Sequence, residues 1–223
     1  MSERTGNVLD LAESIADDKH AIRLTLPDDP KRPVYLNGLS NKLGRMYAGT
    51  KNADYLQESI KAAKEAVKLT PLEDPGRYLN LNTLSNKTFG LFKITEAIVD
   101  LNESIELQIQ AVALNSDLHP DQAEMLNNLG IKLERRFKTT GQESDTKEAL
   151  EAYFRAYRCP NARPLIRVGS ARQTIALLIS KKEWKQACEL AKQAVGVLSL
   201  VNKRSLDLED KQSLLPIFSV LQR

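Results

Sequence analysis

Apolar residues recur along this chain at the three- and four-residue spacing of amphipathic helices. Ile60, Ala63 and Val67 follow this spacing in one segment, and Leu126 and Leu129 begin a similar stripe in another. No segment shows the two-residue alternation of a half-buried strand. The pattern therefore predicts an all-helical protein.

The helical pattern repeats every 45 residues. One type of segment opens with Glu-Ser-Ile or a close variant, and the other opens with Leu-Asn. The repeated positions are Glu13, Glu58, Glu103 and Glu148 in the first type, and Leu36-Asn37, Leu81-Asn82 and Leu126-Asn127 in the second. A fixed period of this length is typical of solenoids, in which each unit buries its apolar face against its neighbours.

Each copy of the repeat should hold two helices. We expect antiparallel pairs over residues 31–69, 76–114, 121–158 and 163–199, preceded by a lone helix over 8–25. Repeated prolines, among them Pro30, Pro75 and Pro120, mark the connectors between pairs.

Features inside each pair can also be predicted. Gly49-Thr50-Lys51-Asn52 and Thr140-Gly141-Gln142 indicate tight turns between paired helices. The equivalent Ile94-Thr95 lacks glycine, so we expect a short kink there. Ala66 and Ala111 should lie where the paired helices approach most closely.

The third copy resembles a known repeat. The run from His119 to Gly130, with its Leu126-Asn127-Asn128-Leu129 core, and Glu148-Ala149-Leu150 after it, is similar to a tetratricopeptide repeat of the long variety. Such repeats occur in kinesin light chains and in large repeat proteins of filamentous fungi. The resemblance covers roughly residues 8–200. It implies a right-handed α-α superhelix, with one repeat array over residues 1–204.

The end of the chain carries a second resemblance. Trp184, Ala187 and the segment from Arg204 to Gln212 are similar to the region that joins fungal repeats to a caspase-like peptidase of the CHAT type. Such a peptidase needs a histidine and a cysteine on an α/β core, which this sequence does not predict. We therefore expect no enzymatic activity. The alternative function is a regulatory repeat arm of a CHAT-type protease whose catalytic domain is absent from this chain.

Residues 205–223 should form a capping helix. The last helix of a solenoid leaves an apolar face that needs a cover with a polar outer side. The segment supplies Leu206, Leu214, Leu215, Ile217, Phe218, Val220 and Leu221 as apolar residues, and Asp207, Glu209, Asp210 and Lys211 as charged ones. The alternative is that this apolar surface is an exposed docking surface for the missing peptidase.

Asparagines recur at one position of the repeat. Asn37, Asn82 and Asn127 lie mid-helix, where asparagine is a mediocre helix former, and Asn41 and Asn86 follow four residues later. The resemblance implies that these side chains line a concave groove and bind the main chain of an extended peptide. The alternative is that the carboxamides bond to neighbouring helices and set the distance between repeats.

The charged residues of the repeat suggest the sign of the ligand's charge. Arg45 and Arg135 share another repeat position that should face the groove, with Gly90 between them. Lysines also recur, at Lys42, Lys87 and Lys132. A mildly basic groove would favour an acidic protein or peptide partner. The alternative is that the lysines are solvated on helix surfaces.

Composition narrows the classes of function. The chain has 32 Lys and Arg against 29 Asp and Glu, a net charge of +3, which argues against nucleic-acid binding. Its longest mid-helix apolar run, Ile175 to Ile179, is too short to span a bilayer. Two cysteines and two histidines, far apart in sequence, predict no disulfide framework, no metal and no cofactor. We expect a cytoplasmic interaction scaffold, and its oligomeric state stays open.

Overall fold

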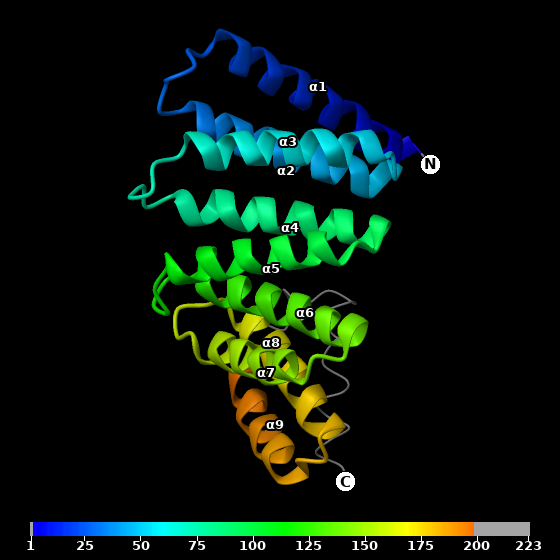
Figure 1. Ribbon diagram of the computed structural model, residues 1–223, viewed down its shortest axis with the longest axis vertical. Coiled ribbons are helices and arrows are strands. Elements are labelled where there is room, and N and C mark those ends of the chain that lie inside the picture. The colour runs from blue at the N-terminus through cyan, green and yellow to red at the C-terminus, as the bar shows by residue number, and fades with distance from the viewer. Residues whose placement is uncertain (1, 199–223) are drawn as a thin grey trace. The chain divides into compact units, whose positions relative to one another are not determined.

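The structure is a computed structural model that describes residues 2–198 of the 223-residue chain. This range forms nine α-helices and contains no strand (Figure 1). The helices are α1 (Ser2–Leu24), α2 (Arg32–Thr50), α3 (Ala53–Leu69), α4 (Arg77–Thr95), α5 (Ile98–Ala113), α6 (Gln122–Thr140), α7 (Glu143–Arg158), α8 (Pro164–Ser180) and α9 (Trp184–Leu198). The predicted all-α fold is confirmed, while the predicted capping helix lies outside the described residues.

The chain divides into two compact units. Unit 1 (Met1–Leu114) holds α1 to α5, and unit 2 (Asn115–Arg223) holds α6 to α9. The predicted helix pairs appear as α2–α3 and α4–α5 in unit 1, and as α6–α7 and α8–α9 in unit 2. We call the first helix of each pair the A helix and the second the B helix. The single array expected over residues 1–204 stays a prediction.

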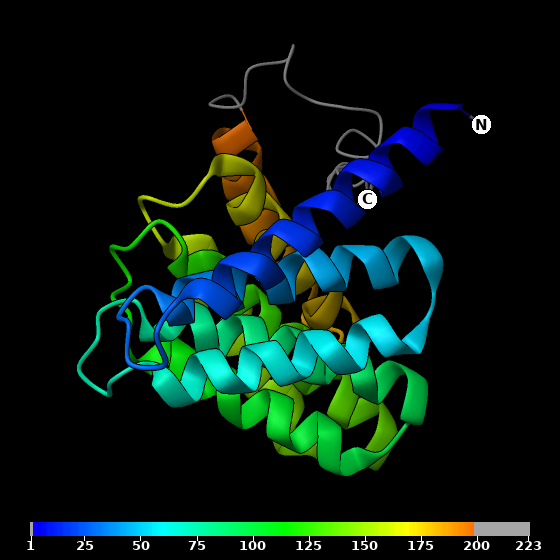
Figure 2. The same ribbon diagram turned by 90° about the horizontal axis from the view of Figure 1, so that it is seen from above.

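The lone N-terminal helix is longer than the sequence predicted. α1 begins at Ser2 instead of near residue 8, and it packs against α2 (Figures 1 and 2). Ile15 and Ile22 of α1 are buried together with Leu36 and Leu39 of α2. α1 therefore serves as the B helix of an incomplete repeat and covers the apolar face of α2.

The pairs α2–α3, α4–α5 and α6–α7 each turn at a residue whose backbone is in the left-handed conformation. Lys51, Glu96 and Gly141 have φ values of 60°, 55° and 75°. The threonine before each turn residue donates to the carbonyl four residues earlier and accepts the N–H two residues later, at 2.8–3.3 Å. The kink predicted at Ile94-Thr95 is wrong, because these bonds hold Glu96 in a conformation that glycine adopts more easily.

In the pairs α2–α3, α4–α5 and α6–α7, the two helices approach closely at a small residue. In unit 1, Ser59 Oγ donates to the Ser40 carbonyl at 2.7 Å, and Ser85 Oγ donates to the Ser104 carbonyl at 2.6 Å. In unit 2 the equivalent contact is at Gly130, where an added Cβ would lie 2.5 Å from the ring of Tyr153. Small residues are required here because anything larger would push the paired helices apart.

An arginine ties successive repeats together. Arg32 Nη1 donates to the carbonyls of Ile22 and Thr25 at 2.7 and 3.0 Å, and Arg77 makes the equivalent pair of bonds one repeat later. In unit 2, Arg167 Nε donates to the Tyr157 carbonyl at 2.9 Å. The last carbonyls of a helix have no partner within the helix, so each arginine satisfies the end of the preceding B helix.

The alanine contacts allow a direct test of packing. Ala66 and Ala111 are fully buried, as predicted. Replacing Ala111 with Leu should lower the free energy of unfolding by about 1–3 kcal/mol, because the extra carbons have no space. The measurement is the midpoint of chemical denaturation. Ala113→Leu is the matched control, because Ala113 is exposed on the same helix. Equal midpoints for the two variants would contradict the packing described here.

Candidate functional site

The predicted site residues of unit 1 lie on two neighbouring A helices. Asn37, Asn41 and Arg45 follow one another at four-residue steps on α2, so they share one face of that helix. Asn82 and Asn86 share a face of α4 in the same way, and α2 and α4 are in contact. Asn41 and Arg45 are exposed, whereas the other three are half-buried.

Asn82 belongs to a polar network inside its own helix pair. Its Oδ1 accepts a hydrogen bond of 3.0 Å from Nε2 of Gln108 on α5. Gln108 is fully buried, and its Oε1, 3.0 Å from Ser85 Oγ, shares that hydroxyl's single proton with the Ser104 carbonyl. The Asn82 oxygen therefore bonds to a neighbouring helix, which is the structural role that the sequence left open as an alternative. The Asn82 amide nitrogen takes no part in that bond.

Asn37, at the same repeat position as Asn82, lacks the hydrogen bond that Asn82 accepts. Its Oδ1 is buried and has no hydrogen-bond partner among the described residues. Position 63 on α3, the equivalent of Gln108 one repeat earlier, is an alanine, which offers no donor. A buried acceptor without a partner costs about 1–3 kcal/mol and is uncommon in folded proteins. Asn37 is therefore the member of the asparagine row with an unused acceptor.

Asn127 is the predicted site residue of α6 in unit 2. Its Oδ1 lies 3.3 Å from Oγ of Ser170 on α8, and that hydroxyl also lies 3.0 Å from the Ile166 carbonyl. A hydroxyl has one proton, so Asn127 shares it with the carbonyl. Arg135, two turns further along α6, is exposed. Asn127 belongs to unit 2 while Asn37 and Asn82 belong to unit 1, so the continuous strip of all three stays a prediction.

The repeated lysines are not solvated in the way that the sequence suggested. Lys42 forms an ion pair of 2.8 Å with Asp18 of α1. Lys132 is fully buried. Lys87 is half-buried against Gly44 of α2, and burial lowers the pKa of its ammonium group. Lys87 has no hydrogen bond or ion pair with any described residue, so it adds uncompensated positive charge to the faces of α2 and α4.

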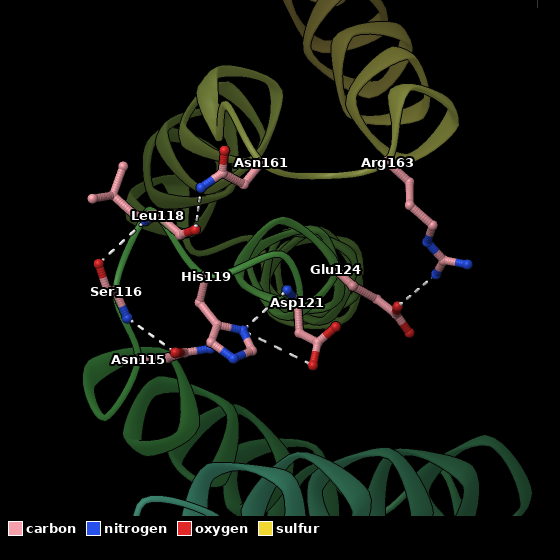
Figure 3. Close-up of polar contacts among 8 residues, drawn as sticks. All are labelled: Asn115, Ser116, Leu118, His119, Asp121, Glu124, Asn161 and Arg163. Atoms are coloured by element: carbon pink, nitrogen blue, oxygen red, sulfur yellow. Dashed lines mark hydrogen bonds and ion pairs between the residues drawn. The ribbon is translucent and has the colours of Figure 1, made fainter.

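The connectors of unit 2 hold a separate polar cluster. His119 Nδ1 accepts from the backbone N–H of Asp121 at 3.2 Å, and Asn161 Nδ2 donates to the Leu118 carbonyl at 2.8 Å (Figure 3). Asp29 and Asp74 accept from backbone N–H groups at the equivalent position of unit 1. These bonds shape the turn before each A helix, so His119 has a structural role here.

The described residues show little sign of catalytic or metal chemistry. They contain no group of three or more His, Cys, Asp or Glu side chains that could hold a metal ion. Cys159 is buried, and burial raises the pKa of its thiol, which opposes formation of a reactive thiolate. Within the same range, no helix has the length and apolar character needed to cross a bilayer.

Comparison with known proteins places the fold. No family model and no curated protein matches this chain. Among solved structures, MamA is 17% identical with a TM-score of 0.61, covering 89% of this chain and 93% of its own. BtubC (BKLC) from P. vanneervenii is 13% identical with a TM-score of 0.63, covering 98% and 83%.

A third structure bears on the resemblance seen in the sequence. The putative kinesin light chain of Podosopora anserina, described as having nearly identical TPR-like repeats, is 17% identical with a TM-score of 0.57. The match covers 91% of this chain and 90% of that one. The chain therefore has the fold of a tetratricopeptide-like helical solenoid. The association with fungal CHAT proteins stays a prediction.

Lys42 and Lys87 provide a test of site electrostatics. Lys87→Met should raise the free energy of unfolding by about 1 kcal/mol, because it removes a half-buried ammonium without a partner. Lys42→Met should lower it by a similar amount, because Asp18 would lose its partner. Urea denaturation at neutral pH measures both, and a change of the same sign in the two variants would contradict this assignment.

The pH dependence gives a second check on Lys87. A lowered pKa in the folded state means that the charged lysine destabilises the fold at pH values below that pKa. The penalty should disappear as the pH rises toward the ordinary value of 10.5, where the unfolded chain also loses the proton. The advantage of Lys87→Met should therefore shrink between neutral and alkaline pH.

Proposed function

We propose that the protein is a non-enzymatic interaction scaffold that binds an extended peptide segment along its A helices. The observation that carries this proposal is the buried Oδ1 of Asn37, which has no hydrogen-bond partner in the part of the chain that the structure describes and is flanked on its helix face by exposed Asn41 and Arg45. Rotation of the half-buried Asn37 side chain would bring that acceptor to a main-chain N–H of a bound peptide. The amide nitrogens of Asn37 and Asn82 would donate to peptide carbonyls.

The charges on the same helices favour an acidic partner. Arg45 is exposed on α2, and Lys87 places an unpaired ammonium beside Gly44 of that helix. Binding a carboxylate there would compensate the partly desolvated lysine. In unit 2, Asn127 and Arg135 would present a similar combination of carboxamide and positive charge on α6.

The experiment compares peptides that differ only in charge. Labelled acidic peptides, and counterparts in which every Asp and Glu is replaced by Asn or Gln, are titrated with the full chain by fluorescence anisotropy. Asn37→Ala should weaken binding of the acidic peptide about 2- to 10-fold, the loss expected for one hydrogen bond. Its free energy of unfolding should be unchanged or higher, because an unsatisfied acceptor is removed.

Asn82→Ala serves as the contrasting variant. It removes the hydrogen bond that Nε2 of the buried Gln108 donates to Asn82, so it should lower the free energy of unfolding by about 0.5–1.5 kcal/mol. If Asn37→Ala destabilises the protein as much as Asn82→Ala and leaves peptide binding unchanged, the asparagine row is structural and the proposal is wrong.

A further inference from the structure

Successive B helices of unit 1 are joined by ion pairs at a repeated position. Lys19 of α1 lies 2.6 Å from Glu58 of α3, and Lys64 of α3 lies 3.3 Å from Glu103 of α5. The two pairs are related by the 45-residue repeat. Each pair joins two successive B helices at the surface of unit 1.

The equivalent residues of unit 2 cannot form this pair. Phe154 of α7 occupies the lysine position, two repeats after Lys64. Gln186 of α9 occupies the glutamate position, because it precedes the fully buried Ala187 as Glu103 precedes the fully buried Ser104. The ion pair of unit 1 is thus replaced by an aromatic ring and a neutral amide.

An open groove lies where the ion pair is lost. It has a volume of about 620 Å³, runs between α7 and α9, and has residues of α8 in its floor. Leu150, Phe154, Leu178 and Leu190 supply apolar lining. A groove of this size accommodates several side chains of a bound segment. None of the predicted peptide-binding asparagines lines it.

The rim of the groove carries charges of both signs, with an excess of one positive charge. Lys147, Arg158 and Lys185 line it together with Glu151 and Glu189. The guanidinium of Arg158 lies 4.2 Å from the centre of the Phe154 ring. An apolar floor with cationic groups at its edge suits an apolar segment that carries acidic residues on one side.

We infer that this groove binds residues 206–221 of the same chain. The sequence continues for 25 residues beyond α9, which forms one wall of the groove. Phe218 and Leu221 follow Pro216 at helical spacing, with Pro216 suited to a first helical turn, and Leu214 and Leu215 precede it as further apolar residues. Asp207, Glu209, Asp210 and Lys211 give the segment a net charge of −2, opposite in sign to the net +1 of the groove lining.

The length of the chain permits this arrangement. Residues 199–205 can span up to about 23 Å when extended. The 15 residues of α9 extend over about 22 Å. The segment can therefore return along α9 to any part of the groove. This site lies between two B helices, and it differs from the cover over the end of the array that the sequence alone suggested. The inference does not depend on peptide binding by the asparagines.

Photo-crosslinking tests the placement of the segment. The photoreactive residue p-benzoylphenylalanine replaces Phe218 in the full chain, and crosslinked peptides are identified by mass spectrometry. Crosslinks within one chain to residues 147–158 or 184–193 are expected. The same probe at Ser219, off the face shared by Phe218 and Leu221, should give a lower yield. Crosslinks mainly to other regions, or between two chains, would overturn the inference.

Two variants test the groove itself. Phe154→Lys with Gln186→Glu introduces the ion pair of unit 1 and should close the groove, lowering the crosslink yield at position 218 about tenfold. Leu214→Asp with Leu215→Asp should also lower the crosslink yield at position 218, and it alters none of the nine described helices. Circular dichroism should show unchanged helix content in both variants. A yield that stays at the wild-type level in both would contradict occupation of the groove by this segment.

Discussion

The architecture depends on the close approach of the two helices in each pair at one small residue. Ser40 and Ser85 bring the helices of unit 1 near enough for hydroxyl-to-carbonyl bonds, and Gly130 leaves space for the ring of Tyr153 in unit 2. This contact fixes which face of each A helix is buried in its own pair. The asparagines three residues earlier and the lysines two residues later are placed by the same constraint.

Much of the fold could be predicted because the residues that determine helices, turns and buried contacts recur in several copies of the repeat. The helix pairs, the buried alanines and the connectors follow from residues that recur at a fixed period. The turn at Glu96 could not be predicted, because its left-handed backbone depends on hydrogen bonds of Thr95 instead of on a glycine. The start of α1 could not be predicted either, since Ser2 to Asn7 are helical whereas the equivalent residues 47–52 end α2 and form the turn before α3.

The candidate site was less accessible from sequence, because identical residues differ in their surroundings. Asn37 and Asn82 share a repeat position, yet only Asn82 faces a glutamine on the following B helix. Lys42 and Lys87 differ in the same way, since Asp18 pairs with the first and Ala63 occupies the equivalent position for the second. Comparing positions across helices, instead of along the A helices alone, would have distinguished these cases. The groove of unit 2 was not predictable from one repeat position, because it depends on Phe154 and Gln186, which lie on two different helices.

The most direct test of the peptide-binding account is side-chain amide NMR of the full chain. The NH₂ signals of Asn37, Asn41 and Asn82 are followed while an acidic peptide is added, with its Asn- and Gln-substituted counterpart as the control. The account predicts progressive shifts at Asn37 and Asn41 with the acidic peptide, and smaller shifts with the neutral one. Unchanged asparagine signals under conditions in which the peptide binds elsewhere on the chain would contradict it.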